Sequence, residues 1–153
     1  MTVRPFNGPL PPARLASLFA PPLLVMAAIF YLSSQTSSGD HSTFELILRK
    51  IGHVTEYTIL ALCWIRAMRG LGVGGDLQGA VIAGVAATLL YAATDEFHQT
   101  FVAGRHGTPV DVLIDSIGMA IAAGLVLWAG PAPKARVHSP GRRVRERLAR
   151  EPG

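Results

Sequence analysis

A polar stretch late in the chain decides the fold. It reads Asp95-Glu96-Phe97-His98-Gln99-Thr100-Phe101-Val102-Ala103-Gly104-Arg105, and two further carboxylates, Asp111 and Asp115, follow it. Apolar runs long enough to cross a bilayer flank this stretch on both sides. A charged side chain costs about 2.5–3.5 kcal/mol at the centre of a membrane helix. Charged residues are therefore found there mainly where another group pairs with them or where they serve a function. The sequence therefore predicts a membrane protein organised around a polar site.

The composition of the whole chain agrees with a membrane protein. Half of the 153 residues are apolar, only 16% are charged, and the mean hydropathy is +0.36. These values are typical of a small polytopic membrane protein, and the length suits one domain. A single cysteine, Cys63, excludes an intramolecular disulfide and a metal site built on several thiolates.

Four apolar runs predict an all-α fold with four transmembrane helices. The runs cover residues 16–32, 51–68, 77–98 and 110–128, and each has the length of about 17–22 residues that spans a bilayer core. The first run also has the character of a signal-peptide core. No small-x-small cleavage site follows it directly, which favours a retained helix.

The segments outside these runs divide the chain into three parts. Residues 1–15 are rich in proline and are expected to be a disordered N-terminal segment, residues 16–129 the membrane domain, and residues 130–153 a basic tail. Within the membrane domain, the polar segment 39–50 has one amphipathic turn, which predicts a helix lying at the interface. The basic tail is expected to contact anionic lipids rather than nucleic acid, because no nucleic-acid-binding fold accompanies it.

The distribution of basic residues predicts the orientation of the chain in the membrane. Four spans place the N-terminus, the loop at residues 66–76 and the tail on one side, and these segments hold 11 Lys and Arg residues. The opposite side holds only Arg49, Lys50 and Arg105. The positive-inside rule therefore places both termini in the cytoplasm, and we expect a multi-pass protein of the bacterial cytoplasmic membrane.

With this topology, ionisable residues from three spans fall at one depth, near the outer face. One shared site explains this coincidence more simply than separate accidents do. The helical repeat of about 100° per residue aligns Asp95 with Gln99 and puts Glu96 about a quarter turn away. The predicted ligand-binding residues are Lys50, His53, Glu56, Tyr57, Asp95, Glu96, Gln99, Arg105, Asp111 and Asp115. Ser33, Ser34 and Gln35 are placed at its rim.

The charges in this predicted site do not balance. Five carboxylates face only Lys50 and Arg105 as permanent cations. Either some carboxylates are protonated, or a cation such as a divalent metal ion or an amine group of a substrate makes up the deficit. Two roles are open for Arg105. Its planar guanidinium can bind a phosphate or carboxylate ligand, or it can neutralise the neighbouring acids.

The same residues resemble a known family, the VanZ-like membrane proteins. Four elements carry the resemblance: Ser33-Ser34-Gln35, Lys50-x-x-His53-x-x-Glu56-Tyr57, Asp95-Glu96-x-His98-Gln99-x-Phe101-x-x-Gly104-Arg105, and Asp111-x-x-x-Asp115-x-x-Gly118. They extend over residues 16–129. The resemblance implies a small helical membrane protein in a cell-envelope setting, and the member that gives the family its name is associated with resistance to the glycopeptide teicoplanin. It does not imply a particular reaction.

Three functions follow from these observations. The first is binding or handling of a membrane lipid or a lipid-linked envelope precursor by the outward-facing polar pocket. The second is a metal- or carboxylate-dependent enzyme acting on a lipid phosphate, with His53, Glu56, Asp95 and Asp115 as ligands or as acid and base. The third is a proton-coupled transporter, which would need a homo-oligomer because four spans leave little room for an alternating pathway.

Overall fold

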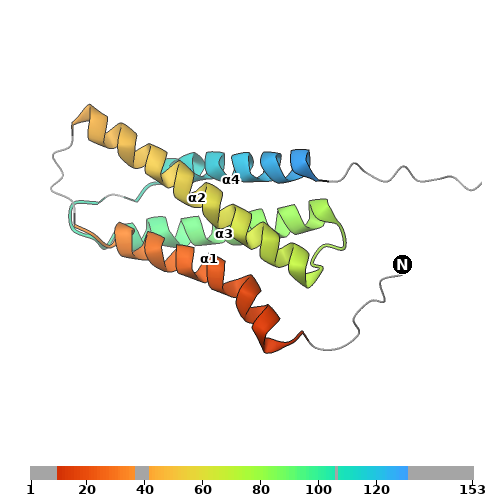
Figure 1. Cartoon of the computed structure of the whole chain (residues 1–153). Helices are drawn as coiled ribbons and strands as arrows, with labels where there is room; N and C mark the ends of the chain where they lie inside the picture. Colours follow the sequence, from red (N-terminus) through yellow and green to blue (C-terminus); the bar gives the residue numbers. More distant parts are fainter. Residues whose placement is uncertain (1–9, 37–41, 106, 131–153) are drawn as a thin grey trace, which may run out of the picture.

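The computed structural model describes residues 10–36, 42–105 and 107–130, and every regular element within these ranges is an α-helix. The elements are α1 (Pro12–Ser33), α2 (Thr43–Leu71), α3 (Leu77–Gln99) and α4 (Pro109–Ala129). Successive helices run in opposite directions, so that α1 and α3 end, and α2 and α4 begin, at one end of the bundle, while the α2–α3 turn lies at the other (Figure 1). The predicted all-α class is confirmed. The tail and the first nine residues lie outside the described residues.

Two helix boundaries differ from the expectation. Helix α1 begins at Pro12 rather than at residue 16. The separate interfacial helix expected before residue 51 is wrong, because residues 43–50 are the first turns of α2. The reason is a capping box, in which the Ser42 side chain accepts a hydrogen bond from the Glu45 N–H while the Glu45 carboxylate accepts one from the Ser42 N–H. No Pro follows within α2, and the helix continues through Gly52.

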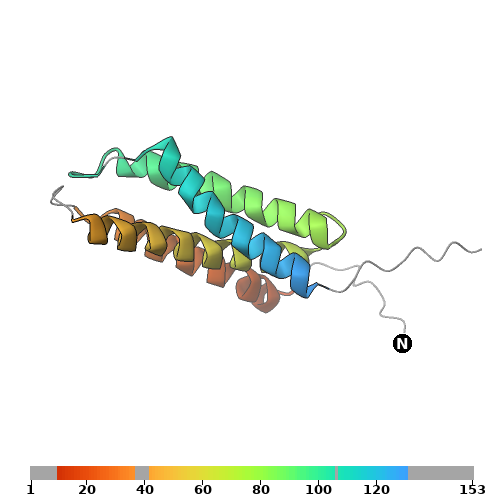
Figure 2. The same ribbon diagram turned by 90° about the horizontal axis from the view of Figure 1, so that it is seen from above.

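Three of the four helices are long and apolar enough to cross a membrane: α1, α3 and α4. Helix α2 is not among them, because its first half carries Arg49, Lys50, His53 and Glu56. It packs extensively on α4 and α3 and also contacts α1. Helix α2 therefore lies against the other three helices (Figure 2). His53 and Glu56 on it are partly buried, whereas Lys50 is exposed.

The outer surface of the bundle is strongly apolar. Large side chains on its periphery are widely exposed, with exposed fractions of 70% at Leu24, 71% at Leu90 and 87% at Trp128. A contiguous apolar surface of this kind is unfavourable in water and favourable in the hydrocarbon region of a bilayer. Together with the three apolar helices, it identifies a membrane protein.

Close backbone approach holds the central helices together. A Cβ atom added to Gly118 of α4 would fall 2.9 Å from the backbone nitrogen of Thr58 in α2, and one added to Gly84 of α3 would fall 2.6 Å from the nitrogen of Ile65. The Thr58 hydroxyl also donates a hydrogen bond to the Gly118 carbonyl across 3.1 Å. Small residues permit such contacts between membrane helices, which gain stability from packing rather than from the hydrophobic effect.

The α2–α4 contact predicts different responses at two glycines of the same helix. Gly118→Ala should lower the free energy of unfolding by about 1–3 kcal/mol, because the added methyl group overpacks the contact with α2. Gly124→Ala is the matched control, since a Cβ atom there has nothing within 4 Å. Thermal unfolding of both variants in the same detergent measures the difference. Equal unfolding midpoints would contradict the proposed tight contact.

Candidate functional site

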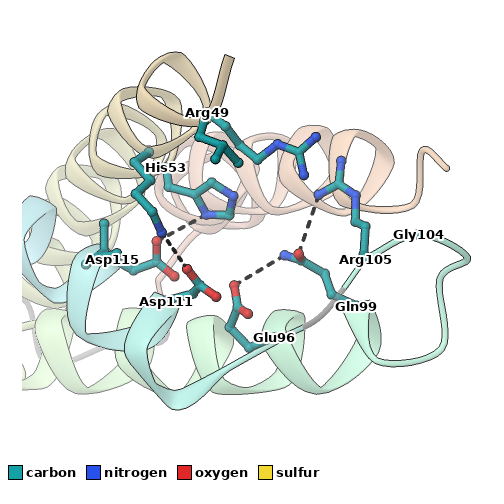
Figure 3. A pocket seen from close by; sticks show the side chains of 11 residues that line it. Arg49, His53, Glu96, Gln99, Gly104, Arg105, Asp111 and Asp115 are labelled. Atoms are coloured by element: carbon teal, nitrogen blue, oxygen red, sulfur yellow. Dashed lines mark hydrogen bonds and ion pairs between the residues drawn. The ribbon is translucent and has the colours of Figure 1, made fainter. Parts of the chain in front are cut away.

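A cavity of about 330 Å³ opens at the end of the bundle where α2 and α4 begin and α3 ends (Figure 3). Most of the residues that line it are polar or charged, and they come from three helices and the α3–α4 loop. Seven of the predicted site residues line it: Lys50, His53, Glu96, Gln99, Arg105, Asp111 and Asp115. The structure thus gathers residues that are up to 65 positions apart in the chain.

A second cavity of about 330 Å³ adjoins the first on the side of α1. Its lining includes Glu56 and Asp95, together with Ser33 at the end of α1. Arg49, His53 and Arg105 line both cavities and so form the wall between them. Tyr57 lines neither cavity; its fully buried ring lies beneath them.

Asp95 joins three helices through its carboxylate. Oδ1 accepts a hydrogen bond from the Ser33 hydroxyl of α1 at 2.6 Å. Oδ2 accepts from the Tyr57 hydroxyl of α2 at 3.4 Å and from the Gln99 amide of α3 at 3.0 Å. All four residues are buried. Asp95 is therefore a structural centre of the bundle as well as a cavity-lining residue.

Asp115 and His53 form a buried pair between α4 and α2. The His53 Nδ1 lies 3.2 Å from the Asp115 Oδ1, and the Asp115 side chain is completely buried. The second carboxylate oxygen, Oδ2, is buried without any hydrogen-bond partner in the described residues. A buried acceptor without a partner costs about 1–3 kcal/mol, so this oxygen requires an explanation.

Glu96 is buried, with 5% of its surface exposed. The segment that leads into α4 folds over it, and its carboxylate accepts a hydrogen bond from the Thr108 N–H at 3.1 Å. Gln99 donates a second one at 3.3 Å. There is no space for a side chain at Gly107, because an added Cβ would collide with the Glu96 carbonyl oxygen.

Lys50 and Asp111 form a more open ion pair at the mouth of the first cavity. The Lys50 Nζ lies 3.0 Å from the Asp111 Oδ1, and the side chains are 52% and 28% exposed. Asp111 also accepts a hydrogen bond from the Thr108 hydroxyl, whose oxygen in turn caps the first turn of α4. Asp111 is thus held at a helix N-terminus, where a carboxylate is favourable.

The Arg105 guanidinium forms its hydrogen bonds with neutral oxygen atoms rather than with the carboxylates. Its guanidinium donates to the carbonyls of Leu32 and Gln35 at 2.8 and 3.0 Å, and to the Gln99 side-chain oxygen at 3.4 Å. Among the described residues it makes no ion pair with a carboxylate. Burial, followed by repulsion from Arg49, lowers the pKa of Arg105, which remains charged because an arginine titrates far above neutral pH.

Sequence reasoning missed two residues of this site. Arg49 lines both cavities, and Thr108 connects Glu96 with Asp111. Thr108 carried a readable signal, because a Thr directly before Pro109 is a typical helix N-cap followed by proline at the first helical position. The residues predicted for the rim lie beside the site: Ser33 contacts Asp95, the Ser34 hydroxyl lies 3.2 Å from the His98 Nε2, and the Gln35 carbonyl accepts a hydrogen bond from Arg105.

The residues best placed for a metal ion differ from those expected. Among the described residues, His53, Glu96 and Asp115 can bring one donor atom each within 4.8 Å of one another. Glu56 and Asp95, which the sequence interpretation included, do not belong to this group. Asp95 is instead saturated by hydrogen bonds from three side chains.

The fold and the site define a helical membrane protein with a polar centre at one end of an apolar bundle. The chain belongs to the VanZ/LLP1 family, whose sequence pattern matches residues 18–130. This match confirms the VanZ-like resemblance drawn from the four sequence elements. No curated protein and no solved structure matches the chain.

The hydrogen bonds of Asp95 predict a marked effect of its removal. Asp95→Ala should lower the free energy of unfolding by about 1–3 kcal/mol, because the buried Tyr57 and Gln99 donors lose their acceptor. Thr94→Ala is the matched control, since the exposed Thr94 hydroxyl bonds only within its own helix. Thermal unfolding of the purified proteins measures both changes. A loss at Thr94 as large as that at Asp95 would argue against the structural role of this carboxylate.

Proposed function

We propose that this protein binds the phosphate-bearing head group of a membrane lipid or of a lipid-linked envelope precursor. In this proposal all four helices span the bacterial cytoplasmic membrane, both termini are cytoplasmic, and the site faces outward. The observation that carries it is the gathering of three basic side chains around one cavity at the end of a lipid-facing bundle. These side chains belong to Arg49, Lys50 and Arg105.

The chemistry of the three basic residues supports a phosphate ligand. A guanidinium matches two phosphate oxygens at once, and two N–H groups of Arg105 are left over from its three hydrogen bonds. Lys50 is half exposed, and an exposed ion pair such as Lys50–Asp111 contributes only about 0–1 kcal/mol. A phosphate entering the cavity can therefore displace Asp111 from Lys50 at little cost.

The surroundings of the cavity favour a ligand with an apolar tail. The cavity volume of about 330 Å³ lies in the range of small-molecule sites, about 300–1,000 Å³. Helices with apolar outer faces surround it, so an acyl or prenyl chain could lie along them while the head group enters the site. The association of the family's name-giving member with glycopeptide resistance supports an envelope setting for this ligand.

One observation favours an enzyme as the second candidate. The His53 imidazole is held by a fully buried carboxylate at 3.2 Å and faces the cavity. This arrangement is the one that general acid–base catalysis uses to orient a histidine. A lipid phosphate bound by Arg49 and Arg105 would lie beside it. Release of inorganic phosphate from the bound lipid would distinguish catalysis from binding alone.

The phosphate hypothesis predicts discrimination between two lipids that differ in one group. The full chain in nanodiscs should bind a polyprenyl phosphate at least about tenfold more tightly than the matching polyprenol, because the basic residues contact only the phosphate. Arg49→Gln and Arg105→Lys should each reduce this preference. Lipid-resolved native mass spectrometry measures both.

Arg69→Ala serves as the control for these variants, since it removes an exposed basic residue in the last turn of α2, away from both cavities. It should leave the preference for the phosphate unchanged. Equal affinity of the wild-type protein for the phosphate and the alcohol would refute the proposal.

The proposed orientation makes a separate prediction. In a Cys63→Ser background, Thr100→Cys at the site end of the bundle should react with a membrane-impermeant maleimide added to intact cells. Val73→Cys, in the turn between α2 and α3, should react only after the membrane is opened. Both positions are exposed in the structure. The reverse labelling pattern would invert the topology and place the site in the cytoplasm.

A further inference from the structure

The unpartnered oxygen of Asp115 points to a missing positive partner in the site. The Asp115 side chain is completely buried, one of its oxygens contacts His53, and the other has no hydrogen-bond partner among the described residues. A carboxylate is rarely retained in such surroundings unless a cation or a proton donor compensates it. The carboxylate borders the first cavity, so a small cation could reach it from there.

The neighbours of Asp115 supply the other donors that a metal ion needs. His53 of α2, Glu96 of α3 and Asp115 of α4 bring their donor atoms within 4.8 Å of one another, and Figure 3 shows the three side chains facing a common space. The His53 Nδ1 lies 3.2 Å from the Asp115 Oδ1, so these two side chains already lie side by side.

Hydrogen bonds from neighbouring residues hold the Glu96 carboxylate in place. Glu96 is oriented by the Thr108 N–H and the Gln99 amide, at 3.1 and 3.3 Å. Such hydrogen bonds to ligating carboxylates are a regular feature of metal sites, because they fix the direction of the lone pairs. The three donor residues lie on three different helices, and two of them, Glu96 and Asp115, are buried.

The local charge also favours a divalent cation. Two carboxylates, Glu96 and Asp115, meet in the group, while Lys50 is paired with Asp111 and the hydrogen bonds of Arg105 go to neutral oxygen atoms. One divalent ion would neutralise both carboxylates and occupy the free lone pair of the Asp115 Oδ2. A monovalent cation would leave a net negative charge buried between the helices.

We propose that His53, Glu96 and Asp115 bind one divalent transition-metal ion, of the class of Zn²⁺ or Mn²⁺. The imidazole nitrogen favours such ions over Mg²⁺ and Ca²⁺, which prefer oxygen ligands. Three protein ligands leave at least one coordination position open toward the cavity. If the proposed phosphate ligand is correct, one of its oxygens would take this position; the metal site itself does not depend on that ligand.

The test measures metal alone, on the full chain in detergent. After removal of metal with a chelator, the wild-type protein should bind close to one Zn²⁺ or Mn²⁺ per chain in isothermal titration calorimetry. The bound ion should also raise the temperature of unfolding. His53→Ala and Asp115→Asn should each weaken binding by at least about tenfold and abolish the thermal shift. Glu96→Gln provides a third variant in case one of the others fails to fold.

Two matched controls separate this site from general attraction of metal to the protein. His98→Ala removes a histidine that stacks on Phe30 at the same end of the bundle, outside the cavity lining. Asp76→Asn replaces an acid at the start of α3, at the opposite end, and asparagine retains the capping oxygen. Both should bind metal as the wild type does.

Three results would overturn the metal proposal. They are no binding of either ion to the wild-type protein, unchanged binding in His53→Ala and Asp115→Asn, or an equal loss in the two controls. Each of these results would leave the preference for a polyprenyl phosphate unaffected, so the two proposals fail independently.

Discussion

The carboxylate of Asp95, buried among four packed helices, is the constraint on which the rest of the structure depends. It is stabilised there because Ser33 of α1 and Tyr57 of α2 donate hydrogen bonds to it, together with Gln99 of its own helix α3. Ser33 and Tyr57 can reach the carboxylate only if their helices have the correct rotation and depth. The hydrogen bonds of a single acid thus help to fix the register of α1 and α2 against α3, which nonspecific apolar packing alone would leave poorly defined.

The four helices differ in how much they contribute to the apolar outer surface and to the polar site. Helices α1, α3 and α4 are long and apolar enough to cross a bilayer, although α3 and α4 each carry two carboxylates at the site end. Helix α2 carries several charged residues in its first half and contacts the other three helices. Gly84 and Gly118 let the backbones of α3 and α4 come close to α2. Acidic and basic side chains thus lie together at one end of the bundle, while the rest of the bundle is packed mainly through apolar and small residues.

The sequence predicted the helices and the convergence of the polar residues well, because both follow from periodicity and from the cost of charges in apolar runs. It could not predict the partners of individual side chains. Arg105 was expected to contact phosphate or the acids, yet it holds the end of α1, since the fold of the loop decides which carbonyls lie nearby. The burial of Glu96 could not be predicted either, because residues 107–108 cover its carboxylate and no pattern in the sequence reveals their path. The capping box that extends α2 was readable at Ser42 and Glu45, but the polarity of the segment obscured it.

The anchoring of Arg105 to the carbonyls of Leu32 and Gln35 affects how the site would meet an incoming anion. A flexible arginine loses about 0.5–1.5 kcal/mol of rotamer entropy when a ligand immobilises it. Here that loss has already occurred during folding, and the guanidinium plane is set before any anion arrives. The same contacts tie the α3–α4 loop to the end of α1, so the mouth of the site behaves as a preorganised frame rather than a closing flap.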